Sequence, residues 1–208
     1  SEGGIDKIKD DRLQFGLETL REFKKIVTLY DALFLRVVGT AVLRKASNRQ
    51  FFIDKASNIL DTKIEIIDGD KEADYIYKGI MLLDEMKTGS HLIMDIGGGS
   101  TEFIVVKNGL KLWSRSFTLG VGALHESFHH SEPISNIEIM QMKSFVLQTI
   151  EELIPVIETY KPVTLSGASG SFEVLQSMSG IDPSCGKVTE VLPVDFNMLY
   201  DRIISSNY

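Results

Sequence analysis

The stretch HLIMDIGGGSTEFIVVKNGLKLW, residues 91–113, decides the fold of this 208-residue chain. An apolar run ends at Asp95, three glycines and the tripeptide Ser-Thr-Glu follow, and a second β-rich run covers residues 103–106. Asn108-Gly109 then has the residue types of a two-residue hairpin turn. The glycines therefore join strand to strand, whereas those of a P-loop or a dinucleotide-binding turn open a helix.

The residue types in this glycine turn predict an anion site with a metal beside it. Three consecutive glycines leave backbone N–H groups uncovered by side chains, as in a phosphate-binding nest. The hydroxyls that follow add donors, and the flanking acids carry hard oxygens of the kind that Mg²⁺ prefers. A plain tight hairpin, with the acids as turn caps, is the alternative. The residues are Gly97, Gly98, Gly99, Ser100 and Thr101 for phosphate, with Asp95 and Glu102 for the metal.

Composition limits the class of protein. The formal charge of −7 gives no general attraction for polyanions, and no dense run of Lys and Arg predicts a nucleic-acid polymer as partner. No apolar run reaches the roughly 18 residues that a membrane-spanning helix needs. No signal-peptide pattern is visible either. Attraction for a phosphate compound must then be local, which favours metal dependence.

Cysteine and histidine residues do not predict a further site. The single cysteine, Cys185, fits a reducing compartment and hence a cytoplasmic protein. It lies in an expected loop without a nearby histidine, so we interpret it as incidental. His125 and His129 fall four apart on an expected helix, but we do not interpret this pair as a metal site.

Hydrophobic periodicity predicts alternating helices and strands, the pattern of an α/β protein. Helices are expected over residues 13–30, 51–60, 71–86 and 196–204, from near Gly122, and as one long helix from a Ser135 cap to Tyr160. Strands are expected over residues 32–38, 63–67, 111–117 and 162–166. The polar link 87–90 predicts a boundary between domains of residues 1–88 and 89–208.

Three more segments carry chemically informative residues. Residues 167–171, GASGS, follow a short strand and enter a helix, where small residues allow phosphate to approach free amides. A plain strand–helix connection is the alternative there. Glu72 is either a reactive carboxylate or an acid that stabilises a helix capped by Asp70. Arg44 is either a phosphate ligand or a solvated charge.

Four segments, in this order and spacing, resemble the exopolyphosphatase/guanosine pentaphosphate phosphatase (Ppx/GppA) family. They are VGTAVLRKASNRQFF (38–52), EIIDGDKEADYIYKGI (65–80), LIMDIGGGSTEFIVVKNG (92–109) and TLSGASGSFEVL (164–175). The resemblance covers about residues 13–180. It implies the α/β fold of actin-like ATPases, with two ribonuclease-H-like lobes around a phosphate-binding cleft and the first lobe incomplete in this chain.

The resemblance also implies an activity. Family members hydrolyse terminal phosphoanhydride bonds of polyphosphate or of guanosine pentaphosphate (pppGpp), with Mg²⁺ or another divalent cation. Exopolyphosphatase is our leading interpretation and pppGpp phosphatase the second. A non-catalytic nucleotide or phosphate sensor is the alternative from another class. A homodimer is also implied.

Carried over position by position, the resemblance assigns roles to individual residues. Glu72 becomes the base that orients the attacking water, and Arg44 a ligand of the substrate phosphate. Asp95 and Glu102 become the metal-binding carboxylates. Residues 97–101 become one phosphate loop. The opposite glycine turn becomes Gly167, Ala168, Ser169 and Gly170.

The sequence departs from the family pattern at several places. Lys71 stands where an acid is usual, Asp74 where Arg is common, and Ser171 where Thr is usual. The family's first phosphate loop, D-x-G-[ST]-N-[ST], and the usual end of the second lobe are not found. We therefore expect a fragment, or ordered pieces joined together, with residues 1–12 a remnant of early strands.

Overall fold

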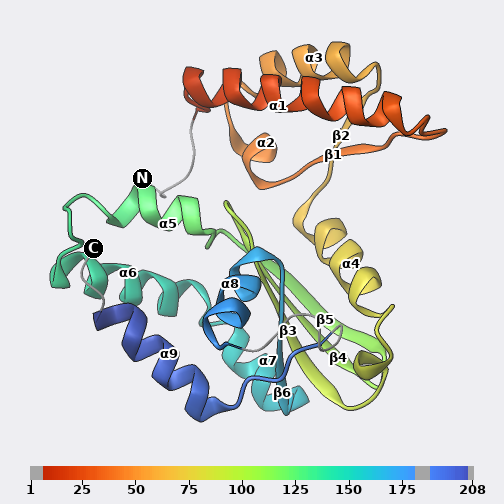
Figure 1. Ribbon diagram of the computed structural model, residues 1–208. Coiled ribbons are helices and arrows are strands. Elements are labelled where there is room, and N and C mark those ends of the chain that lie inside the picture. The colour runs from red at the N-terminus through yellow and green to blue at the C-terminus, as the bar shows by residue number, and fades with distance from the viewer. Residues whose placement is uncertain (1–6, 181–187, 206–208) are drawn as a thin grey trace. The chain divides into compact units, whose positions relative to one another are not determined.

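The chain is described by a computed structural model, which places residues 7–180 and 188–205 (Figure 1). It has the α/β character expected from the sequence and divides into two compact units, Ser1–Glu72 and Ala73–Tyr208. Helix α4 (Gly69–Ile80) carries the chain from the first unit into the second. The lobe boundary after residue 88 stays a prediction, because a compact unit need not coincide with a lobe. Cys185 and residues 1–6 lie outside the described part of the chain.

The first unit packs helices on a small parallel sheet. The sheet joins β1 (Val37–Gly39) to β2 (Ile64–Ile66). The helices are α1 (Asp10–Leu29), α2 (Ala41–Lys45) and α3 (Arg49–Leu60), which confirms the helices expected over residues 13–30 and 51–60. Leu17, Ala56 and Ile64 form the centre of its core.

The strand expected over residues 32–38 is wrong for most of its length. Only Val37 and Val38 of that range pair with β2, because β2 offers just three residues as partners. Leu33 and Phe34 precede the strand and are 86% and 94% exposed. Their apolar character therefore did not indicate burial in a sheet.

The second unit is built on a four-stranded sheet in the order β5-β4-β3-β6. Strands β3 (Ser90–Ile96), β4 (Thr101–Lys107) and β5 (Leu110–Phe117) are antiparallel, and β6 (Thr164–Ala168) runs parallel to β3. The expected Asn108-Gly109 hairpin is confirmed, since both residues have positive φ, 50° and 75°. The glycine turn joins β3 to β4, as the sequence predicted.

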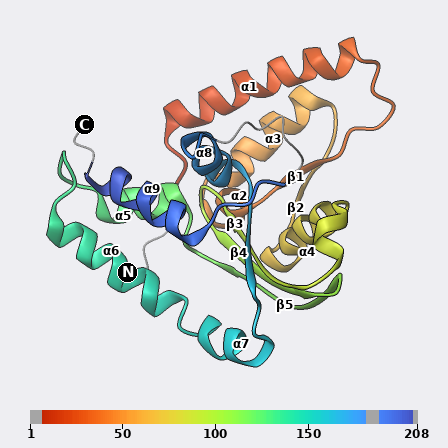
Figure 2. The ribbon, with the colours of Figure 1, turned by 60° about the horizontal axis from the view of Figure 1, so that its bottom comes forward.

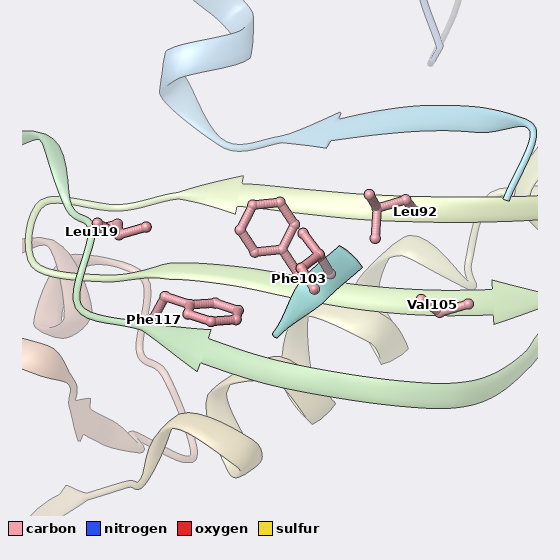
Figure 3. Packing of buried hydrophobic residues seen from close by; sticks show 6 residues of the cluster. Leu92, Phe103, Val105, Phe117 and Leu119 are labelled. Carbon is pink, nitrogen blue, oxygen red and sulfur yellow. The ribbon is translucent and has the colours of Figure 1, made fainter. Parts of the chain in front are cut away.

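Alternation along β3 and β4 gives the sheet two different buried faces. Ile93 and Ile104 lie in register on one face and pack with Ala73 and other apolar residues of α4. Leu92 and Val105 lie in register on the other face (Figure 3). Burying an Ile or Leu side chain stabilises the fold by about 1.5–3 kcal/mol. Covering both faces thus anchors the two strands that flank the glycine turn.

Three helices cover the Leu92 face, namely α5 (Val121–Phe128), α6 (Asn136–Thr149) and α7 (Leu153–Tyr160). The sequence predicted α6 and α7 as one helix. The single helix from 135 to 160 is wrong, because α6 and α7 are separate (Figure 2). Pro155 explains the break, since its ring would clash with the carbonyl of residue 151 inside a continuous helix but is tolerated in a first turn.

Other helix ends follow from local chemistry. Ser135 caps α6 as expected, in a capping box with Glu138. Several hydrogen bonds from Ser131 and Ser135 hold the pKa of the Glu138 carboxyl well below its usual range. The helix expected over 71–86 ends at Ile80, and a separate 3₁₀ turn, η1 (Asp84–Lys87), follows. The remaining helices are α8 (Gly170–Met178) and α9 (Pro193–Ser205).

An ion-pair network at β2 generates a pH-dependent prediction. Glu65 accepts hydrogen bonds from Lys71 and from Arg36, the latter at 2.6 Å from Nη2. These bonds lower the pKa of the Glu65 carboxyl from 4.5 to about 2, and the bond from Lys71 has the largest effect. Because the folded pKa is the lower one, the stabilisation is complete above pH 4.5 and disappears as the pH falls to about 2.

We expect Glu65→Gln to lower the free energy of unfolding at neutral pH and to converge with the wild type between pH 4.5 and about 2. Urea unfolding across this pH range measures the difference. Glu18→Gln, at an exposed position of α1, is the control and should leave stability unchanged. A difference that stays constant down to pH 2 would contradict this account.

Candidate active site

In the first unit, the structure brings two predicted site residues together. Arg44 lies in the last turn of α2 and Glu72 in the first turn of α4. Arg44 Nη1 donates to Glu72 Oε2 at 2.7 Å and to the carbonyl oxygen of Ile67 at 3.0 Å. The two side chains are only 20% and 19% exposed. The bond to Ile67 holds the guanidinium, so Glu72 is oriented by a fixed partner.

The start of α4 bears on the two interpretations of Glu72. Asp68, not Asp70, caps the helix, since Asp68 Oδ1 accepts from the Lys71 amide at 2.8 Å. The sequence placed this cap two residues too late. A first-turn acid is favoured by the helix dipole, which explains an acid at position 72. The dipole does not explain why this acid pairs with Arg44, which lies 28 residues earlier in the chain. Glu72 is therefore part of a specific tertiary ion pair.

The two departures from the family pattern beside Glu72 both make ion pairs. Lys71 contacts Glu65, as described above. Asp74 accepts a hydrogen bond from Lys111 of β5, which lowers the pKa of the Asp74 carboxyl. Each changed side chain therefore has a local structural partner, and Glu72 keeps its own partner, Arg44.

In the second unit, the glycine turn spans Gly97–Gly99 and is closed by a bond from the Gly97 amide to the Ser100 carbonyl at 2.9 Å. Gly98 is exposed, whereas Ser100 and Thr101 are 5% and 3% exposed. Within residues 7–180 and 188–205, the amides of Gly98, Gly99 and Ser100 have no backbone acceptor. Unused amides in an exposed glycine turn are what an anion-binding nest requires.

The two predicted metal-binding carboxylates lie opposite each other. Asp95 of β3 is in register with Glu102 of β4, so the two side chains share a face of the sheet. Glu102 is 2% exposed and its Oε1 accepts from Ser116 Oγ at 2.7 Å. Like charges directly opposite repel, and a cation between them relieves the repulsion. The donor chemistry of this pair fits a hard divalent cation.

The pair does not by itself form a complete metal cage. In the described part of the chain, no group of three or more His, Cys, Asp and Glu residues is placed to hold a metal ion. Mg²⁺ is commonly bound by one or two carboxylates together with waters and substrate phosphates. Asp95 and Glu102 therefore suit an ion that arrives with a phosphate substrate.

The second predicted glycine turn lies beside the first. Ala168 of β6 is in register with Asp95, because β3 and β6 are parallel neighbours. The hydroxyls of Ser169 and Ser171 both donate to the carbonyl oxygen of Ile96, at 3.3 and 3.2 Å. The two turns thus meet at one edge of the sheet and are tied together through Ile96.

The two glycines of this second turn, Gly167 and Gly170, have different surroundings. A Cβ on Gly167 would lie 2.0 Å from the ring of Phe172, so Gly167 is required by packing. A Cβ on Gly170 would meet nothing within 4 Å. Gly170 opens α8, and among the described residues its amide has no backbone acceptor, whereas the Phe172 amide donates to the Ser169 carbonyl at 3.0 Å. Among these glycines, Gly170 is therefore the better candidate to approach a phosphate.

The predicted site residues accordingly form two groups, one in each unit. The first group is Arg44 with Glu72, and the second contains the carboxylates and the two glycine turns. Sequence reasoning missed Ser116, which orients Glu102, and Gly120, which packs against the first glycine turn. The position of Ser116 follows only from the β4–β5 register. The sequence Leu-Gly-Val-Gly at residues 119–122, directly after β5, was a visible signal for Gly120.

Comparison with known proteins places these motifs in a family. The model of the Ppx/GppA phosphatase family matches residues 2–207. A guanosine-5'-triphosphate,3'-diphosphate pyrophosphatase of Vibrio vulnificus (strain YJ016) is 32% identical over 181 residues, which cover 84% of this chain and 36% of that protein. The crystal structure of an exopolyphosphatase from Cytophaga hutchinsonii is 30% identical, with a TM-score of 0.91 over 100% of this chain and 69% of the other. The Aquifex aeolicus family member shares the fold, at 20% identity and a TM-score of 0.71 over 97% of this chain and 65% of the other.

The chain belongs to the Ppx/GppA phosphatase family. The expected family resemblance and α/β fold are thereby confirmed. The chain spans about a third of the length of the curated relative from Vibrio vulnificus. Among the helices described for residues 7–180 and 188–205, none has the length and apolar character to cross a membrane.

The Ser116–Glu102 contact generates a prediction about stability. We expect Ser116→Ala to lower the free energy of unfolding by about 1–3 kcal/mol, because a buried carboxylate oxygen loses its donor. Urea unfolding at neutral pH measures the change. Ser114→Ala is the matched control on the same strand and face; its hydroxyl accepts only a long hydrogen bond of 3.4 Å from Lys111, so the substitution should change stability by less than about 0.5 kcal/mol. Equal effects of the two substitutions would contradict a stabilising role of the Ser116–Glu102 hydrogen bond.

Proposed function

We propose that the protein hydrolyses terminal phosphoanhydride bonds with the help of a divalent cation, and that polyphosphate is its substrate. The observation that carries this proposal is the Arg44–Glu72 ion pair. A largely buried carboxylate held by a guanidinium is fixed in direction, which is what a base that positions water needs. Family membership supports the same reaction class.

Glu72 has the central role in the proposed reaction. Its carboxylate accepts a hydrogen bond from the attacking water and takes a proton as the oxygen–phosphorus bond forms. The bond from phosphorus to the bridging oxygen breaks, and the shortened chain leaves with that oxygen. The proton then passes to a product oxygen. Positioning of this kind, together with electrostatics, accounts for most of the catalysis in phosphoryl transfer.

The other residues bind charge. A guanidinium carries five N–H donors, and the bonds to Ile67 and Glu72 account for two, so Arg44 has donors for a phosphate. The amides of Gly98 and Gly99, and the start of α8 at Gly170, supply neutral donors. A divalent cation at Asp95 and Glu102, Mg²⁺ in our proposal, would neutralise charge on the substrate phosphates.

The choice of polyphosphate over pppGpp rests on similarity. The solved structure from Cytophaga hutchinsonii, at a TM-score of 0.91, is called an exopolyphosphatase. Relatives at 32% and 34% identity are called guanosine-5'-triphosphate,3'-diphosphate pyrophosphatases, which makes pppGpp the second candidate substrate. A homodimer and a cytoplasmic location complete the proposal, supported by the family resemblance and by the single cysteine of the chain.

We expect Glu72→Gln to reduce phosphate release from long-chain polyphosphate with Mg²⁺ by about 10²–10⁴-fold, because the amide cannot accept the proton of the attacking water. Initial rates of the whole protein over a range of polyphosphate concentrations separate kcat from KM. Glu18→Gln is the control acid in the first unit. Undiminished release by Glu72→Gln would remove this residue from the mechanism, and tight binding without turnover by the wild type would favour a sensor.

Competition between substrates tests the second half of the proposal. With equal concentrations of polyphosphate chain ends and pppGpp, we expect phosphate to be released mainly from polyphosphate. The ratio of kcat/KM values, measured with one preparation, gives the preference. Faster consumption of pppGpp would leave the reaction class intact and reverse the substrate assignment.

A further inference from the structure

The first turn of α5 holds the glycine turn through its backbone. The amide of Val121 donates to the Gly97 carbonyl at 3.0 Å, and the amide of Gly122 donates to the Gly98 carbonyl at 2.9 Å. The Ala123 amide also reaches the Gly98 carbonyl, at 3.3 Å. No side chain caps α5. The N-terminal amides that a helix leaves without partners are therefore used here to bind the carbonyls of another turn.

These bonds determine where the amides of the glycine turn point. In a trans peptide the N–H group points away from the C=O group. The carbonyls of Gly97 and Gly98 point toward α5, so the N–H groups of Gly98 and Gly99 point away from it. A peptide whose carbonyl accepts a hydrogen bond is also polarised and becomes a better donor at its N–H. The start of α5 thus sets both the direction and the strength of these donors.

Close packing keeps the segment before α5 against the turn. A Cβ on Gly120 would lie 2.2 Å from the backbone nitrogen of Gly99 and 2.3 Å from the carbonyl carbon and oxygen of Gly98. Only glycine fits at this distance. The hydroxyl of Thr101 donates to the Leu119 carbonyl at 2.7 Å and is itself buried. The segment is therefore held by the Leu119 carbonyl at one end and by the first amides of α5 at the other.

We propose that residues 120–123 are a positioning element, which holds the amides of Gly98 and Gly99 in the direction of a bound phosphate. This inference rests on the proposed function, because it assigns the glycine turn to phosphate. It gives Gly120 and Val121 a role in substrate affinity although neither residue binds the substrate directly. The backbone of α5 acts through the carbonyls of the turn.

Val121→Pro is the sharpest test. Val121 is the first residue of α5, where proline is well tolerated, and its side chain is 55% exposed. Gly120 has φ −77° and ψ 153°, the extended conformation that a residue before proline adopts. The substitution is compatible with the helix itself, but it removes the N–H donor to Gly97 and places the ring Cδ against the Gly97 carbonyl oxygen, which must turn away. Val121→Ala is the matched control, since it also changes the side chain but keeps the donor.

The measurement uses methylenediphosphonate, whose P–C–P bridge is not hydrolysed, with the whole protein labelled with ¹⁵N-glycine. We expect the amide signals of Gly98 and Gly99 to shift on titration of the wild type and of Val121→Ala. In Val121→Pro, methylenediphosphonate should bind at least about threefold to tenfold more weakly, because the Gly97 carbonyl loses its donor and is displaced by the ring. The KM for polyphosphate should rise in step. Wild-type affinity in a folded Val121→Pro variant would overturn the proposal.

A second variant, at Gly120, distinguishes a change in affinity from a loss of folding. Gly120→Ala places a Cβ against the backbone of the turn, so we expect affinity to fall by about tenfold or more. Its control is Gly79→Ala, where a Cβ meets nothing within 4 Å. Loss of the folded spectrum in both Val121→Pro and Gly120→Ala would show a structural role and also overturn the proposal. Failure of the proposed function has a different signature: wild type that binds methylenediphosphonate and releases no phosphate from polyphosphate.

Discussion

The antiparallel pairing of β3 with β4 is the constraint on which the rest of the second unit depends. This register places Ile93 opposite Ile104 on the face covered by α4, and Leu92 opposite Val105 on the face covered by α5–α7. The same alternation puts Asp95 opposite Glu102 at the end of the α4 face. A slip of one residue would turn the acids to the other face and the core residues to the wrong helices. Core packing therefore also fixes the carboxylate pair.

The phosphate-binding character that we propose for this end of the sheet depends on backbone groups held by their neighbours. The parallel β3–β6 pairing brings two turns to the same edge, where two serine hydroxyls share the Ile96 carbonyl. The carbonyls of the first glycine turn accept hydrogen bonds from the amides of α5. Since donors and acceptors of each peptide point in opposite directions, binding its carbonyls on one side presents its amides on the other. In a chain with net charge −7, such local donors replace a positively charged surface.

Local signals predicted most of the fold, and the expected elements that were wrong have different physical reasons. The hairpin at Asn108-Gly109 and the capping box at Ser135 were predictable because neighbouring residues create them. The strand over residues 32–38 failed because apolar character alone does not supply a pairing partner. The single helix expected over residues 135–160 is two helices because Pro155 is not tolerated in the interior of a continuous helix. Lobe organisation and residue roles carried over from the family stay predictions.

By itself, the sequence determined the family, the strand–glycine–strand unit, and the residue types of the site: three glycines, flanking acids, Arg44 and Glu72. These depend on order and spacing along the chain. Only the tertiary structure decided that Arg44 binds Glu72, that Ser116 orients Glu102, and that α5 holds the glycine turn. Each of these contacts joins residues at least 14 positions apart. Such pairs are set by strand register and helix packing, which local patterns do not specify.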